Sequence, residues 1–376
     1  MRILINCSNL RVGGGLQVAH SFLNEIRENI DYQFLIVMSE SLAQQIDVTL
    51  FSKNFQFKYY SIQPSAIKAI LGKDNYLDKL EINFKADIVF SVFGPTYWRP
   101  KAKHICGFAK PSYIYKESPF FKMLSKKEFV KLKLMEFFHM FDFKNNNNLL
   151  ITENKNVSII LSKRINKKVL TVTNFYNQVF NNQMIWDDKV KFEEDLDFFK
   201  LLTISANYPH KNLSIIKSVI PILKSKYPDF KFKFYLSLTH ADFGIQKNDI
   251  LNENICFFGK VSINQCPSLY QQCDFLFLPT VLECFSASYC EAMVMEKPIL
   301  TSDLSFARGI CEDAAFYFNP MDAADIAEKI YELSNDKILQ NLLRKRGIVQ
   351  LEKFDTSNTR AKKYLKIIKE EYENSK

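Results

Sequence analysis

Two glutamates in the second half of the chain, Glu283 and Glu291, stand eight positions apart and carry the groups needed to hold a sugar. Residues 274–280 before them form an apolar run that stops after a proline, which predicts a buried parallel strand, and the residues after Ser286 favour a helix. Glu283 would then lie in the loop at the carboxyl end of the strand, and Glu291 in the first turns of the helix. Ligands of open α/β sheets bind at that edge, where carboxylates can accept hydrogen bonds from hydroxyl groups.

Each glutamate also has a structural interpretation. The spacing Ser288-x-x-Glu291 is that of a capping box, so Glu291 could simply close a helix N-terminus. Glu283 lies between Leu282 and Cys284 after an apolar strand, where a carboxylate needs a hydroxyl, a backbone N–H or a cation as partner. The pair alone leaves the structural and the ligand-binding interpretations open.

Glycine is scarce in this chain, yet three of its ten glycines are consecutive, Gly13, Gly14 and Gly15, after the first expected strand and before a helical run. A turn without side chains exposes backbone N–H groups at a helix N-terminus, where partial positive charge favours phosphate. A tight turn would explain the glycines equally well. A dinucleotide fingerprint requires a third glycine where Val18 stands, although Glu40 could still be the ribose-binding acid of such a site.

Lys211 occurs at the end of the first expected strand of the second half, just before a helix start. A lysine there can reach a diphosphate. A solvated lysine is the common alternative, but the helix dipole makes the position mildly unfavourable for a cation, which hints at function. His210 beside it could donate to the same phosphates or merely be exposed.

The sequence offers little support for metal, protease or hydrolase chemistry. Asp195 and Asp197 have the DxD spacing that can hold Mn²⁺ or Mg²⁺ on a diphosphate, but they lie in an acidic run that favours a solvated linker. No HExxH or GxSxG motif occurs. The eight cysteines are scattered without a CxxC pair, so they are interpreted as buried thiols of a reducing compartment.

The length of the chain and the order of its expected strands and helices predict two α/β domains, which must position these residues. A chain of 376 residues exceeds the size at which one core keeps growing. Apolar runs alternate with helical segments, which predicts two parallel, doubly wound sheets. We expect Rossmann-like domains at 1–175 and 201–356, a linker at 176–200, and a terminal amphipathic helix at 357–376 that packs back on the first domain. The expected strands are 2–7, 33–39, 55–62, 87–93, 103–108, 149–152, 169–173, 201–205, 230–238, 255–261, 274–279, 298–301 and 315–318.

The positive charge belongs to the first half, where residues 1–175 hold 25 Lys and Arg against 14 Asp and Glu. It concentrates in the region 99–133, from Arg99 to Lys133, where ten basic residues face only Glu117 and Glu128. This region predicts an anionic partner such as a membrane or lipid phosphate, and no recognised module supports nucleic acid. For most of residues 122–143 we favour an ordinary packed helix with a solvated face. The start of the chain is too weakly apolar for a signal peptide and no run suits a bilayer span, so we predict a cytoplasmic protein, in contact with the inner face of the membrane.

In the order of its motifs the chain resembles the retaining glycosyltransferases of family 4, which have the GT-B fold. The resemblance rests on the glycine turn, on the lysine loop at residues 209–212, on the EX7E block from Glu283 to Glu291, and on the strand after Lys297. It implies two Rossmann-like domains facing a central cleft, the first binding the acceptor and the second the nucleotide sugar. The family's reaction proceeds without a metal and without a bound cofactor, with a UDP- or GDP-linked sugar as co-substrate. The acceptor would be a glycan or a lipid-linked glycan of bacterial surface polysaccharide synthesis.

The resemblance also assigns roles residue by residue. Lys211 and the amides of Gly13, Gly14 and Gly15 would neutralise the diphosphate. Glu283 would contact hydroxyls of the donor sugar and, with Lys211, is the catalytic assignment. Glu291 would accept hydrogen bonds from the nucleotide ribose. Amides around Phe285, Ser286 and Ala287 would contribute to phosphate binding because they open the next helix.

Four positions depart from the family pattern: Ala206 replaces a basic residue, Ser286 and Glu296 replace glycines, and no residue matches the acceptor-site histidine, since His104 lies early. We therefore name no catalytic base. The alternatives are another GT-B enzyme such as a sugar-nucleotide epimerase, a catalytically silent partner that binds nucleotide or membrane, and an NAD-dependent oxidoreductase that would use Glu40.

Overall fold

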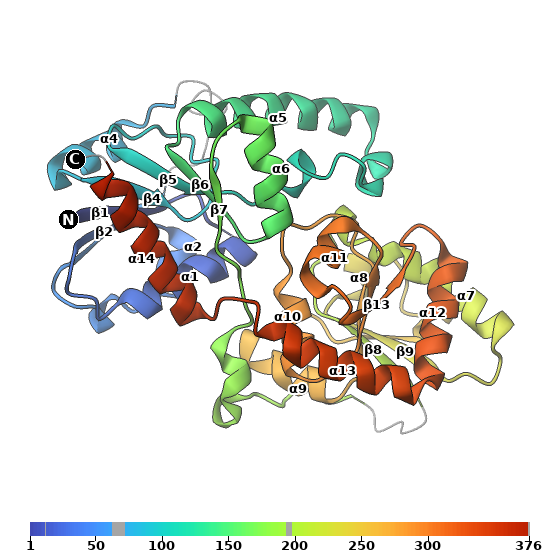
Figure 1. Cartoon of the computed structure of the whole chain (residues 1–376). Coiled ribbons are helices and arrows are strands. Elements are labelled where there is room, and N and C mark those ends of the chain that lie inside the picture. The colour runs from blue at the N-terminus through green and yellow to red at the C-terminus, as the bar shows by residue number, and fades with distance from the viewer. Residues whose placement is uncertain (12, 62–71, 193–197, 375–376) are drawn as a thin grey trace. The chain divides into compact units, whose positions relative to one another are not determined.

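The computed structural model describes residues 1–11, 13–61, 72–192 and 198–374. These residues form two compact units, and each contains one parallel sheet with helices on its faces (Figure 1). Every expected strand is present, to within a few residues at its ends, and the predicted fold class is confirmed. Residue 62, the expected end of the third strand, lies outside the described part of the chain.

The first sheet has seven strands in the order β3-β2-β1-β4-β5-β6-β7, all parallel. Its inner strands are covered on both faces, which is why they appear in the sequence as unbroken apolar runs. The strands are β1 (Arg2–Cys7), β2 (Gln33–Ser39), β3 (Phe55–Tyr60), β4 (Ile88–Ser91), β5 (Lys103–Gly107), β6 (Leu149–Thr152) and β7 (Val169–Thr171).

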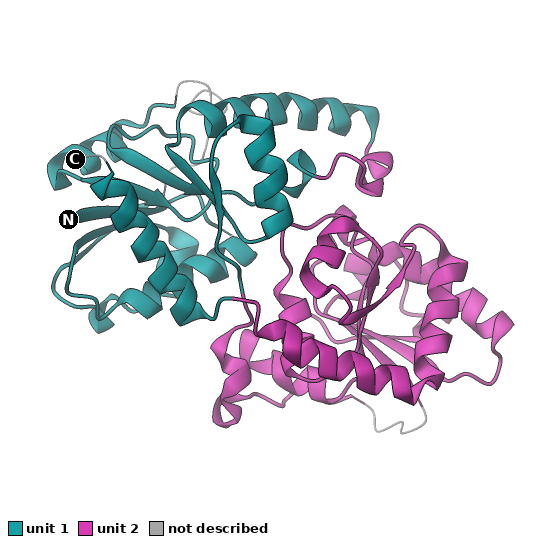
Figure 2. Cartoon of the chain, in the orientation of Figure 1, with its two compact units in different colours: residues 1–114, 125–174, 355–376 teal, residues 115–124, 175–354 magenta. Residues whose placement is uncertain are grey.

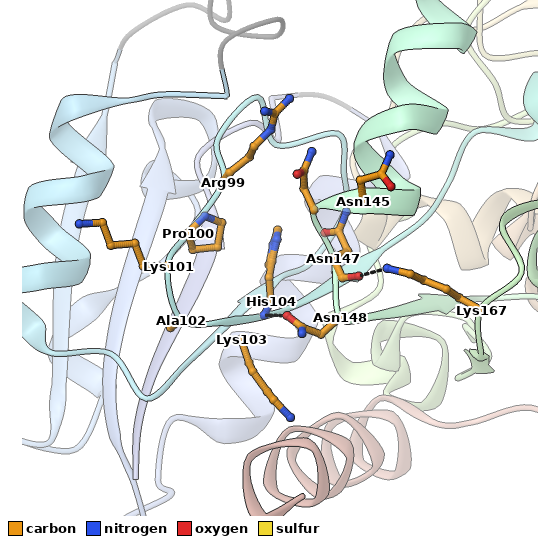
Figure 3. A pocket seen from close by; sticks show the side chains of 11 residues that line it. Arg99, Pro100, Lys101, Ala102, Lys103, His104, Asn145, Asn147, Asn148 and Lys167 are labelled. Carbon is orange, nitrogen blue, oxygen red and sulfur yellow. Dashed lines mark hydrogen bonds between the residues drawn. The ribbon is translucent and has the colours of Figure 1, made fainter. Parts of the chain in front are cut away.

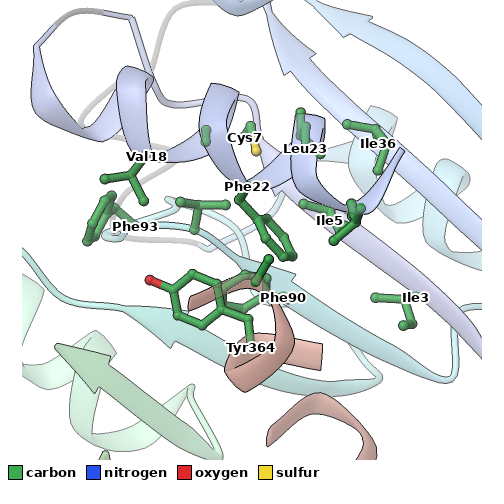
Figure 4. Close-up of a cluster of buried hydrophobic side chains, with 14 of the residues drawn as sticks. Ile3, Ile5, Cys7, Val18, Phe22, Leu23, Ile36, Phe90, Phe93 and Tyr364 are labelled. Carbon is green, nitrogen blue, oxygen red and sulfur yellow. The ribbon is translucent and has the colours of Figure 1, made fainter. Parts of the chain in front are cut away.

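Helices from distant parts of the sequence cover this sheet. Phe22 of α1, Phe90 of β4 and Tyr364 of α14 form an aromatic cluster, with ring centroids 5.1 to 5.6 Å apart (Figure 4). The helix at the end of the described chain therefore supplies part of the core of the first sheet. The helices of this unit are α1 (Gly14–Ile26), α2 (Glu40–Ala43), α4 (Asn75–Phe84), α5 (Lys126–Asn145), α6 (Lys155–Ile165) and α14 (Ser357–Glu373).

The second sheet has six parallel strands in the order β10-β9-β8-β11-β12-β13. Its strands are β8 (Phe199–Thr203), β9 (Phe232–Leu236), β10 (Ile255–Phe257), β11 (Phe275–Leu278), β12 (Ile299–Ser302) and β13 (Ala315–Phe318). The helices are α7 (Ile216–Lys226), α8 (His240–Phe243), α9 (Cys266–Gln271), α10 (Ala287–Val294), α11 (Ser305–Cys311), α12 (Ala323–Asn335) and α13 (Lys337–Leu351).

The two units are not continuous in sequence (Figure 2). Unit 1 comprises residues 1–114, 125–174 and 355–376, and unit 2 comprises residues 115–124 and 175–354. The segment 115–124, which we expected in the first domain, contacts unit 2, where Ser118 Oγ donates to the carbonyl of Val281 at 2.6 Å. The expected linker also contacts unit 2 before residue 193, since the rings of Phe192 and Tyr235 lie 4.1 Å apart.

Helix α5 contradicts the expectation of an ordinary packed helix. Only Glu136, His139 and Phe143 of its 20 residues are buried, and several large apolar side chains are exposed instead. Within the described ranges, no helix combines the length and the apolar character needed to cross a bilayer.

Candidate functional site

The neighbouring strands β8 and β11 bring two loops of unit 2 together. The strands pair in parallel, with Leu202 opposite Leu276, so their carboxyl ends meet at one edge of the sheet. The loop after β8 leads to a short 3₁₀ helix (Pro209–Lys211), and the loop after β11 leads to α10. The carbonyl of His210 accepts hydrogen bonds from the amide of Val281 at 2.8 Å and from Thr280 Oγ1 at 3.0 Å. These two bonds hold the loops together.

Lys211 and Glu283 meet at this junction and form an ion pair between Nζ and Oε1. Their side chains are only 18% and 13% exposed, so little water weakens the attraction. Thr280 Oγ1 lies 3.4 Å from the same carboxylate oxygen. The partner that Glu283 was expected to need is therefore a lysine. An ammonium group has three donors, so one bond to Glu283 leaves Lys211 able to donate to a further anion.

Glu291 is a buried carboxyl on α10, 9% exposed. Tyr270 of α9 donates its hydroxyl hydrogen to Glu291 Oε2 at 3.0 Å. Burial raises the pKa of Glu291 from 4.5 to about 7, and the hydrogen bond from Tyr270 opposes this rise. The carboxyl therefore changes charge near neutral pH. Sequence reasoning missed Tyr270, because no local pattern pairs a tyrosine with a glutamate 21 residues later.

The capping-box interpretation of Glu291 is wrong. The helix begins at Ala287, with Ser286 rather than Ser288 at the N-cap, so Glu291 is its fifth residue and lies beyond the capping position. Burial against Tyr270 accounts for its contacts instead. One structural explanation of this glutamate is thereby removed.

The N-terminus of α10 lies directly after the loop that carries Glu283. Ser286 is extended and buried, and its side chain caps no amide of the helix. The first amides of a helix lack intrahelical partners, and together they favour an anion. Phe285, just before, packs its ring on Phe354 with centroids 5.7 Å apart. The residues predicted to bind phosphate, Phe285, Ser286 and Ala287, therefore lie at the start of α10, next to Glu283, which pairs with Lys211.

His210 is partly buried beside the ion pair. Its ring is stacked on that of Tyr208, with centroids 5.7 Å apart, and burial lowers its pKa while the charge of Glu283 opposes the shift. The imidazole is therefore disposed to be neutral near pH 7, when one ring nitrogen can donate and the other can accept.

The glycine turn belongs to unit 1 and follows β1. Gly13 is the N-cap of α1 with φ of 75°, a left-handed conformation that favours glycine. A Cβ at Gly15 would lie 3.3 Å from the ring of Phe93, which is a tight contact. A Cβ at Gly14 would meet no described heavy atom within 4 Å. Packing and conformation thus explain Gly13 and Gly15, whereas Gly14 has neither reason among the described residues.

His104 lies inside the first sheet, on β5. Its Nε2 is 2.8 Å from Ser91 Oγ, and burial lowers its pKa to about 4. The side chain of His104 is only 2% exposed, so it cannot contact an acceptor substrate. Asp195 and Asp197 lie outside the described residues, and in the described part of the chain no three His, Cys, Asp or Glu side chains gather in a way that could hold a metal ion.

Unit 1 also has a polar hollow of about 340 Å³ at the opposite edge of its sheet from the glycine turn (Figure 3). Its walls are the residues before and at the start of β5 and the residues that precede β6 and β7, including Arg99, Lys103 and Lys167. These three cations already have partners. Arg99 contacts Asp142 at 3.5 Å, Lys103 contacts Glu371 at 3.5 Å, and Lys167 Nζ donates to the carbonyl of Asn147 at 3.0 Å. The hollow gives no indication of a ligand.

The part of the chain that carries the ion pair also has a recognisable relationship to known proteins. Residues 184–350 match the family model "Glycosyl transferases group 1". The matched range includes Lys211, Glu283 and Glu291. The chain is also 25% identical over 179 residues to the O-antigen chain mannosyltransferase RfbU of Salmonella typhimurium. That alignment covers 46% of this chain and 47% of the relative, so the chain spans about half the length of the curated relative it matches.

Solved structures resemble the chain over nearly its whole length. Sucrose-phosphate synthase from Thermosynechococcus elongatus has a TM-score of 0.68, with 9% identity and full coverage of both chains. TarM of S. aureus, in a complex with UDP, has a TM-score of 0.64, with 13% identity and coverage of 98% and 99%. A glycosyltransferase from Rickettsia africae has a TM-score of 0.62, with 16% identity and 98% of each chain covered. At these identities the comparisons show the fold, which is that of GT-B proteins.

Proposed function

We propose that the chain is a glycosyltransferase that takes a sugar from a nucleotide-diphosphate donor bound at the carboxyl edge of the second sheet. Lys211 and the N-terminal amides of α10 bind the diphosphate. The amides of Gly13, Gly14 and Gly15 are proposed as a further phosphate-binding group. Glu283 accepts hydrogen bonds from hydroxyls of the sugar, and Glu291 accepts them from the ribose.

In the proposed reaction a hydroxyl of the acceptor attacks the anomeric carbon on the same face of the sugar from which the leaving group departs. The new bond joins the acceptor oxygen to that carbon, and the bond from the carbon to the diphosphate oxygen breaks. Because the new bond forms on the face from which the old one breaks, the configuration is retained. The hydroxyl proton passes to a phosphate oxygen, and the proposed reaction uses no metal or bound cofactor. The residues then act by orienting the donor and by stabilising the negative charge that develops on the diphosphate.

The ion pair between Lys211 and Glu283 carries the proposal. It brings a lysine, a side chain suited to phosphate, beside a glutamate, a side chain suited to hydroxyls, at the edge of the sheet where ligands of open α/β folds bind. The match of residues 184–350 to group 1 glycosyl transferases supports the same chemistry. The similarity to a mannosyltransferase makes a mannosyl donor the first to test. A glycan or lipid-linked glycan acceptor, a UDP or GDP carrier, a cytoplasmic location and contact with a membrane remain parts of the proposal.

Calorimetric titration with UDP, GDP, their sugars and NAD tests the donor site. We expect a nucleotide-diphosphate sugar to bind, and Lys211→Met to weaken it by about 10-fold or more, because a charge-assisted hydrogen bond is lost. Lys224 provides a matched control, since it forms an exposed ion pair with Glu253 in the same unit at 2.7 Å. Lys224→Met should bind as the native chain does.

Turnover is then measured with the donor that binds and a panel of glycan and lipid-linked acceptors, with and without EDTA. Product of retained anomeric configuration, formed equally in EDTA, is the expected result. Binding without turnover would favour a catalytically silent partner, and conversion of the donor without acceptor would favour an epimerase. Preferential binding of NAD, insensitive to Lys211→Met, would refute the proposal.

A further inference from the structure

The outward face of α5 carries a stripe of four apolar side chains that nothing in the described structure covers. Val130, Leu134, Phe137 and Phe141 are 65%, 58%, 68% and 55% exposed. They follow one another at intervals of four, three and four residues, which places them on one side of a helix. Figure 1 shows α5 as a long helix at the outside of unit 1.

The stripe lies opposite the side by which α5 is attached to its unit. The buried residues of the helix are Glu136, His139 and Phe143. At 3.6 residues per turn they project from the other side of the helix axis. His139 bonds there to the hydroxyl of Tyr113 at 2.8 Å, and Glu136 forms an ion pair with Arg164. The helix is therefore fixed to unit 1 by one side and presents the other.

Lysines flank the N-terminal part of the stripe on both sides. Lys126 and Lys133 project on one side of it, and Lys127 and Lys131 on the other, all of them exposed. Lys133 lies 3.6 Å from the buried Glu136, so its charge is partly balanced. The exposed acid of this stretch, Glu128, is held by Ser125 in a capping box at the start of the helix. The face is thus apolar along its centre, with lysines on both sides of its N-terminal part.

We propose that this face of α5 docks on an anionic lipid bilayer, with the helix lying parallel to the surface. The apolar stripe would enter the boundary between head groups and acyl chains, and the lysines would contact anionic head groups. The α5 face refines the predicted basic region 99–133, since the structure assigns the segment 115–124 within that region to unit 2. The inference does not depend on the proposed transferase activity.

A second copy of the chain fits the same face less well. Intervals of four and three residues are also those of a helix pair, in which the margins of one helix face the margins of its partner. In a parallel pair the lysines of one helix would face those of the other, and such like charges disfavour pairing. Anionic head groups would attract the lysines of this face, so charge complementarity favours the bilayer.

Flotation with lipid vesicles tests the proposal on the full chain. We expect binding to vesicles of phosphatidylglycerol and phosphatidylcholine in equal parts, weak binding to phosphatidylcholine alone, and weaker binding as salt screens the charges. Lys127→Gln with Lys131→Gln should weaken binding about 30-fold, because each lysine near an anionic surface contributes about fivefold. Leu134→Gln with Phe137→Gln should weaken it at least as much.

Matched variants elsewhere in unit 1 are the controls. Lys362→Gln with Lys366→Gln removes two exposed lysines from α14, and Ile30→Gln with Ile159→Gln removes two exposed apolar side chains. Both should bind as the native chain does. Equal loss in test and control variants, or full binding by the α5 variants, would overturn the proposal. The proposal would also be overturned if the native chain does not bind vesicles but sediments as a dimer, and if Leu134→Gln with Phe137→Gln dissociates that dimer.

Discussion

The raised pKa of Glu291 leads to a quantitative prediction for the stability of unit 2. The carboxyl has a pKa of about 7 in the folded chain, against 4.5 when solvated. Below about pH 4.5 it is protonated in both states, so it contributes no pH dependence. Between about 4.5 and 7 only the folded state keeps the proton, and the free energy of unfolding therefore falls as pH rises. Above about pH 7 the loss is complete and amounts to about 3 kcal/mol.

Glu291→Gln removes the titration while keeping an oxygen that can accept the hydrogen bond from Tyr270. We expect the variant and the native chain to be similarly stable near pH 4.5. The variant should then gain over the native chain by about 1.4 kcal/mol per pH unit, up to about 3 kcal/mol by pH 8. A bound ribose should reverse the preference, because hydroxyl donors favour the ionised carboxylate.

Urea unfolding followed by tryptophan fluorescence measures this difference. The chain has two tryptophans, and Trp186 lies in unit 2 while Trp98 lies in unit 1, so Trp98→Phe makes the signal specific for unit 2. Glu296→Gln, at an exposed position just after the same helix, is the control and should follow the native pH profile. A difference between Glu291→Gln and the native chain that stays constant from about pH 5 to about pH 8 would refute the reasoning.

Three further predictions concern single contacts. Lys211→Met and Glu283→Gln should each lower the free energy of unfolding by about 1 to 3 kcal/mol, because each leaves a poorly hydrated charged partner unpaired. The double variant should lose clearly less stability than the sum of the two single variants. Additive losses in urea unfolding would contradict the ion pair. Gly13→Ala should cost about 1 kcal/mol because of its positive φ, whereas Gly14→Ala should be neutral or slightly stabilising in thermal melts; equal losses would argue against this assignment. Tyr270→Phe removes the hydrogen bond that lowers the pKa of Glu291, so the pH-dependent loss of stability should extend to higher pH in the same urea experiments. An unshifted pH profile would contradict this role of Tyr270.

The strands could be predicted because a strand buried on both faces has a local signature. Ile3, Leu4 and Ile5 of β1 are all fully buried, and no polar residue interrupts such a run. The same signature placed Glu283 and Lys211 after strand ends. That they touch depends on β8 lying next to β11, a neighbour relation between segments some 70 residues apart that no local pattern encodes.

The errors arose where tertiary contacts decide between equally good local patterns. Ser288 and Glu291 have capping-box spacing, but the helix starts before Ser288, and the carboxylate of Glu291 accepts a hydrogen bond from Tyr270. The many phenylalanines of α5 suggested a packed helix. Whether another element covers an apolar side chain is a property of the fold, and for α5 the structure leaves the stripe uncovered.

The discontinuous units have a consequence for the order in which the protein can fold during its synthesis. The chain passes between the units after residues 114, 124, 174 and 354. Although the strands of unit 1 are made first, the aromatic cluster of Phe22 and Phe90 receives Tyr364 only after all of unit 2 has been translated. Unit 2, in turn, has its segment 115–124 ready before its first strand exists. The half of the protein that leaves the ribosome first is therefore the last to complete its core.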